Sequence, residues 1–509
     1  MNTLRLQKID ETDALYSLKS TGADLTDYRE QLARERNART LTLRRSQRPT
    51  IAQFLSKAAQ SNQNRIPLID SGNFPFLDPS YAISQLNTGN SNTLQEFLNH
   101  ITSCAQQTPR LAQNLVKAPG VSEAFVNALS AGYSEQMIIS IIRSLIVLFP
   151  IAGESMTTYV DDGLVMCLFD FLSSESVPLL QASIALTDVI SEASGYARDS
   201  ILCFNLHQFL IDVALSERDD QLTLQSCEAL NKIFMNKQQI EPTILAGCVD
   251  QMACLLQLHN VQAVNTVLMC FVSMTNQMSA LVFNLFDLNL FPIIVNMLSN
   301  QDLVSAALPL IGNLSVGHAA HIQSLLDNGL LSHLMILIDT EYTADVFWVL
   351  SNLVESVPHL TINLFSKDFI EKTVDIAASS SYEIEKEATF FLSTLIIFTE
   401  TEDLIFFMQS SMLDLMIEML GCGVLLIILR CLDALIRLSR AIEMKMSNSG
   451  VFLNLNGEFV EMFSGNEIHK RLSDLTDQKS NLIRERAEFL LKQIDACCPG
   501  DVASSLLAM

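Results

Sequence analysis

The stretch DNGLLSHLMILI, residues 327–338, contains the pattern that decides the fold of this chain. Gly329 precedes an apolar residue, Leu330, and a second apolar residue, Leu334, lies five places after the glycine. Glycine, and to a lesser degree asparagine, adopts positive φ at low cost. The pattern therefore predicts a tight turn between helices, followed by an apolar helix.

The same pattern recurs along the chain at nearly constant intervals. Its anchor residues are Gly120, Gly163, Asn205, Gly247, Asn289, Gly329, Asp368, Met412 and Gly457. Successive anchors are 43, 42, 42, 42, 40, 39, 44 and 45 residues apart, and Asp368 and Met412 fit the pattern least well. In each repeat a second apolar helix is expected after the anchor and its first apolar helix. Examples are residues 181–191, 306–317, 346–356 and 388–398. One unit cannot bury its apolar faces alone, so neighbouring units must stack. An all-helical repeat of about 42 residues predicts a solenoid of the armadillo or HEAT type.

Composition and charge indicate which kinds of partner the chain can bind. The chain has 509 residues, more than one compact core usually holds, with only 18 glycines and 13 prolines. Its net charge is −24, yet residues 29–48 hold seven arginines and two glutamates, about +5, which leaves about −29 for the rest. An acidic body with a basic N-terminal arm fits a basic protein partner and argues against nucleic acid.

Several other classes of protein find no support in the sequence. The eleven cysteines show no CxxC pairs or zinc spacing, which is typical of reduced thiols. The first residues contain no apolar stretch long enough for a signal peptide, and no uninterrupted apolar run approaches the ~20 residues of a membrane span. No nucleophile, phosphate-loop or metalloprotease motif occurs. We therefore expect no enzyme activity, no cofactor, no metal and no membrane partner.

The only tryptophan, Trp348, is followed four positions later by Asn352, on the same helix face. Aligning the second apolar helices places this pair level with Phe390/Thr394, Pro309/Asn313, Met269/Ser273, Glu228/Lys232 and Ile184/Asp188. Trp348 is either a core aromatic or part of a binding surface. The repeat register favours the surface, because burying Asn352 unpaired would be costly.

This register resembles the importin α (karyopherin α) family, in which Trp-x-x-x-Asn recurs on the third helix of successive armadillo repeats. Residues 181–199 resemble a second repeat, 307–329 a fifth, 385–395 a seventh, and 429–444 and 456–495 the closing repeats. The resemblance implies an all-α, right-handed superhelical armadillo solenoid of about nine to ten repeats. It also implies a cargo-binding site made of Trp348, Asn352, Asn313, Phe390, Asp188 and Glu192. In that family the rings hold lysine and arginine stems, and the asparagines bind the ligand backbone.

The N-terminal segment resembles the family's importin-β-binding segment. Lys19, Gly22 and Asp24 precede the arginines, and a Leu-Arg step follows at 41–45. The residues implied to bind importin β are Arg29, Arg34, Arg36, Arg39, Arg44 and Arg45. The alternative is a solvated basic arm. The Lys-Arg-Arg run with which the family occupies its own groove has no clear counterpart, and Arg44, Arg45 and Arg48 are its nearest substitutes.

The resemblance implies a nuclear import adaptor that shuttles between cytoplasm and nucleus. Its partners would be importin β, basic cargo proteins with a nuclear localisation signal, and a nuclear export receptor. Residues 1–70 would form the arm and linker, 71–497 the solenoid, and 498–509 a tail. The alternative is an armadillo scaffold or chaperone outside the transport cycle. Lys232 among the predicted sites would repel a basic ligand.

Overall fold

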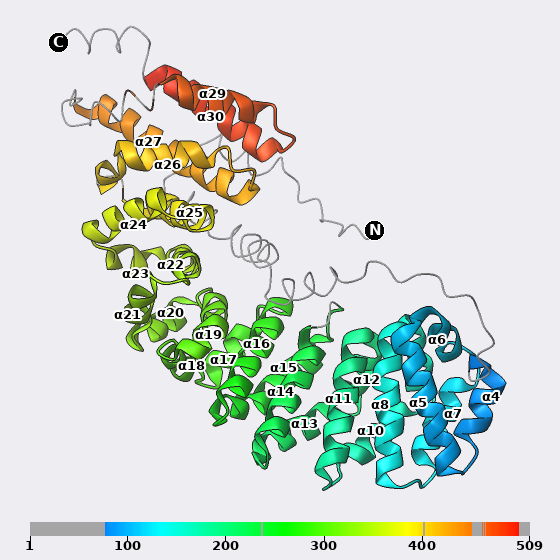
Figure 1. Ribbon diagram of the computed structural model, residues 1–509. Coiled ribbons are helices and arrows are strands. Elements are labelled where there is room, and N and C mark those ends of the chain that lie inside the picture. Colours follow the sequence, from blue (N-terminus) through cyan, green and yellow to red (C-terminus); the bar gives the residue numbers. More distant parts are fainter. Residues whose placement is uncertain are drawn as a thin grey trace. The chain divides into compact units, whose positions relative to one another are not determined.

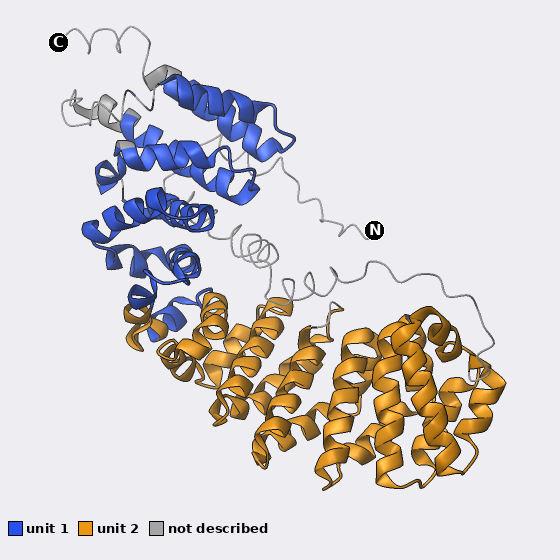
Figure 2. Cartoon of the chain, viewed as in Figure 1, with its two compact units in different colours: residues 1–51, 315–324, 334–509 blue, residues 52–314, 325–333 orange. Residues whose placement is uncertain are grey.

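The computed structural model describes residues 77–235, 238–400, 403–449 and 465–497, together with 461 and 463. All regular elements in these ranges are helices, and no strand occurs in them (Figure 1). The prediction of an all-helical fold is confirmed for these residues. The described chain forms two compact units, coloured separately in Figure 2. Among the described residues, unit 2 comprises 77–235, 238–314 and 325–333, and unit 1 comprises 315–324, 334–400, 403–449, 461, 463 and 465–497.

Within each unit, one helix of a repeat packs against its counterpart in the next repeat, and we call this set the ladder helices. In unit 2 they are α5 (Ser91–Gln107), α8 (Glu135–Ala152), α11 (Val177–Ala193), α14 (Asp220–Met235), α16 (Val261–Gln277) and α19 (Gln301–Leu314). In unit 1 they are α22 (Thr343–Ser356), α25 (Tyr382–Phe398), α27 (Leu425–Ser449) and α30 (Asn481–Cys497). Within each unit they pack in chain order, which is the arrangement that the repeat predicts.

Shorter helices connect the ladder helices and cover their other side. In unit 2 they are α4 (Pro79–Leu86), α6 (Pro109–Val116), α7 (Val121–Ser130), η2 (Gly153–Met156), α9 (Thr157–Asp161), α10 (Leu164–Leu172), α12 (Gly195–Cys203), α13 (Leu206–Ser216), α15 (Pro242–Met252), η3 (Ala253–Gln257), α17 (Leu281–Asp287) and α18 (Phe291–Met297). In unit 1 they are α23 (Pro358–Thr361), η4 (Ile362–Leu364), α24 (Lys367–Ser379), η5 (Asp403–Phe407), α26 (Ser410–Met419) and α29 (Asn466–Thr476). Residues of α20 (Ala319–Asp327) and α21 (Leu330–Leu337) are divided between the units.

The predicted turns have the expected backbone at most anchors. Gly163 has φ 107° and directly precedes α10, and Asn205 has φ 56° and directly precedes α13. Positive φ also occurs at the anchors Gly120, Asn289 and Gly329. These residues let the chain change direction between two helices within two to four residues.

Three predicted anchors are wrong. Gly247 lies inside α15, Asp368 inside α24 and Met412 inside α26. In these repeats the shorter apolar helix already begins before the anchor, with Pro242 at the start of α15 and Ser366 capping α24. The apolar spacing was correct there, but the turn lies earlier. The last anchor, Gly457, is outside the described residues.

Polar contacts between residues about one repeat apart tie successive repeats together. The Gln113 amide donates to the Ile151 carbonyl at 2.8 Å, and Tyr159 donates to the Val116 carbonyl at 3.2 Å. Burial raises the pKa of Tyr159, so its hydroxyl stays protonated and remains a donor. In unit 1, Arg437 donates to the Thr399 carbonyl at 3.2 Å.

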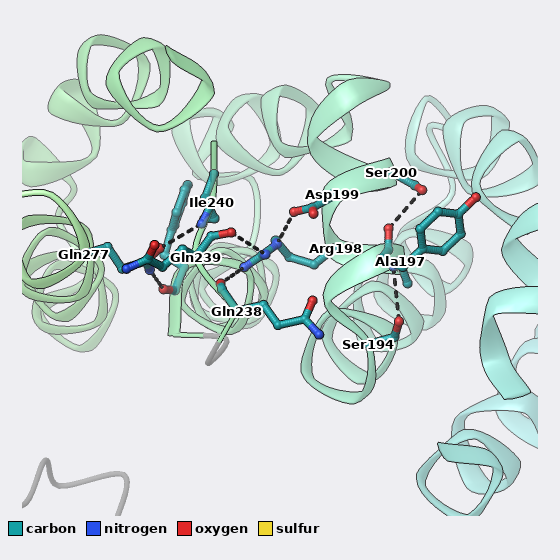
Figure 3. A network of polar contacts seen from close by, with 11 residues as sticks. Ser194, Ala197, Arg198, Asp199, Ser200, Gln238, Gln239, Ile240 and Gln277 are labelled. Atoms are coloured by element: carbon teal, nitrogen blue, oxygen red, sulfur yellow. Dashed lines mark hydrogen bonds and ion pairs between the residues drawn. The ribbon is translucent and has the colours of Figure 1, made fainter. Parts of the chain in front are cut away.

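Arg198 on α12, whose side chain is fully buried, makes a further tie of this kind (Figure 3). Its Nη1 donates to the Gln238 carbonyl at 2.9 Å and its Nη2 to the Gln239 carbonyl at 3.4 Å. Its Nε lies 2.6 Å from Asp199 Oδ1, whose side chain is half exposed. The guanidinium thus satisfies two carbonyls of the segment that joins α14 to α15.

One ladder helix in the described part of the chain, α8, is long and apolar enough to cross a membrane, and half of it is buried. It packs between α5 and α11, which accounts for its apolar composition. Its charged residues, Glu135 and Arg143, lie outside this buried set.

Candidate functional site

The predicted aromatic and asparagine pair of unit 1 lies on α22. Trp348 is 4% exposed and Asn352 is 3% exposed. A ligand stem can therefore reach the indole only if atoms now in contact with it move. Both residues lie where the sequence register placed them, one turn apart on a ladder helix. The small exposed area agrees better with the core alternative than with an open binding surface.

Phe390 on the next ladder helix, α25, is fully buried and has a cation against its ring. The guanidinium carbon of Arg430, from α27, lies 4.7 Å from the ring centroid. Arg430 Nη2 also lies 2.6 Å from Glu355 Oε1, on α22. Their side chains are only 8% and 9% exposed, so the ion pair is shielded from solvent. A ring and a carboxylate together hold a guanidinium here.

Asn313, on α19 in unit 2, is 1% exposed and bonds to the preceding ladder helix. Its Nδ2 donates to Thr275 Oγ1 at 2.8 Å and to Asn276 Oδ1 at 3.2 Å, both on α16. The amide thus ties two ladder helices together. To donate to a ligand backbone carbonyl, Nδ2 would have to exchange at least one of these partners.

The two predicted acidic site residues lie one turn apart on α11, as expected. Glu192 is mostly exposed, and its Oε2 lies 2.8 Å from Nζ of Lys232, on α14. Asp188 is half buried. The group of Asp188, Glu192, Glu228 and Lys232 therefore carries three carboxyl groups and one ammonium.

The pKa of the Asp188 carboxyl is raised from 3.8 to about 6, chiefly by burial. Lys232 lowers this pKa, while Glu192 and Glu228 raise it. Two neighbouring carboxylates thus oppose the single lysine. A further cation placed beside Asp188 would favour its ionised form. The electrostatic energy of this cluster therefore favours binding of one more positive charge.

The remaining predictions lie outside the described residues. They comprise Arg29, Arg34, Arg36, Arg39, Arg44 and Arg45, together with the boundary at residue 70 and the tail 498–509. Among the described residues, no group of three or more His, Cys, Asp or Glu side chains is arranged to hold a metal ion.

Comparison with known proteins shows a likeness of fold. No protein-family model matches the sequence, and no curated protein matches it. An engineered protein of known crystal structure aligns with a TM-score of 0.64 at 17% identity, over 82% of this chain and 99% of that chain. A chain from a structural study of the interaction between cadherin and β-catenin aligns with a TM-score of 0.51 at 11% identity. That alignment covers 82% of this chain and 94% of the other. The fold is a helical-repeat fold.

The structure places two further residues, Arg430 and Glu355, at the candidate site beside Phe390. The sequence analysis did not identify either of them. The available signal was a lone arginine within the apolar stretch 425–436, whose buried position requires an anionic partner. The partner lies 75 residues away, on a helix two repeats earlier. No local pattern identifies it. Lys232 was expected to repel a basic ligand, and the structure shows its direct partner, Glu192.

Proposed function

We propose that this chain is an armadillo-repeat adaptor that binds basic, extended nuclear localisation signals along its ladder helices. Its N-terminal arm would link the cargo to importin β. The sites for cargo would include Trp348, Asn352 and Phe390 in unit 1, and Asn313, Asp188 and Glu192 in unit 2. The handedness of the solenoid, its nine to ten repeats and its shuttling between cytoplasm and nucleus belong to the same proposal.

The observation that carries the proposal is the guanidinium of Arg430 between Phe390 and Glu355. It supports the view that ladder helices of unit 1 offer an aromatic ring and a carboxylate to a basic side chain. Cation–π contacts contribute about 0.5–2 kcal/mol each, so several subsites are needed for micromolar affinity, roughly −8 kcal/mol. The net charge of −24 would add long-range attraction for a basic ligand.

A second candidate function is an armadillo scaffold or chaperone outside the transport cycle. The specific observation that favours it is that the chain's own cations occupy two of the predicted subsites. Lys232 pairs with Glu192, and Arg430 stacks on Phe390. A scaffold that binds partners of another chemistry would use these pairs only to hold its repeats together.

The deciding experiment is a pull-down with importin β, combined with fluorescence anisotropy of a labelled lysine- and arginine-rich peptide. An adaptor binds both, and deleting residues 1–70 abolishes importin-β binding while the thermal unfolding of the remaining chain changes little. Reversing the charge at Arg39, Arg44 and Arg45 should have the same effect, and the affinity should fall steeply with salt.

An acidic peptide of equal length is the control and should not bind. Undiminished importin-β binding by the shortened chain would contradict the role of the arm. Absence of binding to both importin β and the basic peptide would favour the scaffold.

A further inference from the structure

We propose that Phe390 and Glu355 form a binding slot for a guanidinium or ammonium group, and that Arg430 fills this slot as an internal ligand. The inference deepens the proposed function and rests on it, because it identifies which residue controls access of a basic ligand to unit 1. A lysine or arginine of a peptide enters the slot only after Arg430 has left it.

The geometry of the slot is that of a ligand site for a cation. The Arg430 guanidinium carbon lies 4.7 Å from the Phe390 ring centroid, within the ~6 Å at which cation–π attraction operates. Its Nη2 lies 2.6 Å from Glu355 Oε1, a short charge-assisted hydrogen bond. The two charged side chains keep 8% and 9% of their surface exposed, so the slot is shielded yet reaches solvent at an edge.

The Arg430–Glu355 ion pair joins helices that are two repeats apart, whereas the other polar contacts between repeats described above join adjacent repeats. The ladder helix α25 packs against both α22 and α27. Glu355 comes from α22 and Arg430 from α27, so the pair crosses the face of α25 that carries Phe390. Other ties in unit 1 join adjacent repeats, such as Arg437 to the Thr399 carbonyl. A peptide that runs along the ladder helices would have to cross the same face.

Unit 2 shows a related arrangement, which is an independent reason to regard the chain's own cations as occupants. Lys232, on α14, bonds Glu192 on the preceding ladder helix, α11. In both places a later ladder helix supplies the cation and an earlier one supplies the carboxylate. The Glu192 pair is more exposed and lacks a ring, so the proposal is confined to the slot in unit 1.

The test is chemical rescue of the variant Arg430→Ala in the full chain. Methylguanidinium chloride, up to ~20 mM, is added while the melting temperature is followed by circular dichroism. It should raise the Tm of R430A by about 2–4 °C and that of the wild type by less than about 0.5 °C, because a ligand stabilises only the folded state that has an empty slot. Sodium chloride at equal ionic strength corrects for screening.

Two further variants make the result specific. In R430A/E355Q the rescue should disappear, because the slot has lost its carboxylate. Lys372→Ala removes the same charge from unit 1 at an exposed pair with Asp339 and should show no rescue. If R430A does not fold, recovery of its helical signal on adding methylguanidinium is the supporting result. Arg430→Gln, which keeps part of the stem on the ring, is then the second variant for the melting series.

Peptide anisotropy separates this inference from the proposed function. R430A should bind an arginine-rich peptide about three- to tenfold more tightly than the wild type, and Lys372→Ala should stay within about twofold. Methylguanidinium rescue without peptide binding to any form would uphold the slot and refute the proposed function. Peptide binding by the wild type, with neither rescue nor tighter binding in R430A, would overturn the slot alone. Rescue of equal size in R430A/E355Q would also overturn it.

Discussion

Lys232 Nζ lies 2.8 Å from Glu192 Oε2, and the two residues come from successive ladder helices, α14 and α11. The acid that was predicted to attract a ligand lysine thus already has a lysine partner from its own chain. Both side chains are partly exposed, 38% for Lys232 and 65% for Glu192. An exposed pair of this kind contributes little to stability and can be exchanged by a competing cation.

Replacing Lys232 should therefore strengthen binding of a basic peptide to unit 2. We expect Lys232→Ala to tighten binding about two- to fivefold, since an exposed ion pair contributes roughly 0–1 kcal/mol. The unfolding free energy should change by less than about 0.5 kcal/mol. Anisotropy titrations at two salt concentrations measure the first effect, and urea denaturation the second.

The matched control is Lys372→Ala, which removes an equal charge at the Lys372–Asp339 pair of unit 1. If both variants tighten binding equally, the gain reflects net charge alone. The proposed role of Glu192 as a lysine partner would then be wrong.

The pH dependence of stability should report on Asp188. Its folded pKa of about 6 lies above the ordinary 3.8, so the folded chain holds this proton more strongly than the unfolded chain does. The resulting stability is present below about pH 4 and is lost as the pH rises through about 6. Asparagine does not ionise, so Asp188→Asn does not lose this stability as the pH rises. The variant should gain about 1–2 kcal/mol relative to the wild type between pH 4 and pH 7.5, after allowance for partial exposure.

Urea denaturation at several pH values measures this difference. Asp199→Asn is a suitable control, because Asp199 is a half-exposed carboxyl of the same unit. A constant offset between wild type and Asp188→Asn across the pH range would show that Asp188 titrates normally in the folded chain.

Arg198 should be among the residues whose removal destabilises unit 2 most. Arg198→Ala removes a fully buried side chain together with the donor to the carbonyls of Gln238 and Gln239. The cavity left by the buried side chain and the loss of charge-assisted hydrogen bonds together should lower the unfolding free energy by about 2–5 kcal/mol. Asp199→Ala, which removes only the exposed partner, should cost less than about 1 kcal/mol. Equal losses for the two variants would indicate that the ion pair, not the carbonyl contacts, holds this segment.

Trp348 should matter for stability as well as for binding. With 4% of its surface exposed, Trp348→Ala is expected to cost about 3–5 kcal/mol of unfolding free energy. Trp348→Phe keeps a smaller ring and should retain the fold, but it weakens basic-peptide binding by about 0.5–1 kcal/mol if the indole belongs to the site. Urea denaturation and anisotropy measure the two effects.

Phe347→Leu provides the comparison for Trp348, because Phe347 is fully buried and stacks on Phe391 at 5.9 Å. It should lower stability without changing peptide affinity. Unchanged affinity in Trp348→Phe would assign Trp348 to the core, as the alternative reading of the sequence holds.

The sequence by itself determined the helical repeat and most of its turns. Apolar spacing along the chain and the low cost of positive φ at Gly163 or Asn205 are local properties, and they act within a few residues. The same local argument misplaced the turn at Gly247, because helix α15 begins earlier, at Pro242. Proline suits the first turn of a helix, where its missing N–H needs no partner.

Only the tertiary structure decided which charges meet. Lys232 and Glu192 are 40 residues apart, and Arg430 and Glu355 are 75 residues apart. Their contact depends on how far each ladder helix is shifted and rotated against the next. A shift of one residue moves a side chain about 1.5 Å along the axis and 100° around it, enough to break either pair. The repeat period aligns the helices only to within a few residues, whereas a hydrogen bond requires agreement to a few tenths of an ångström.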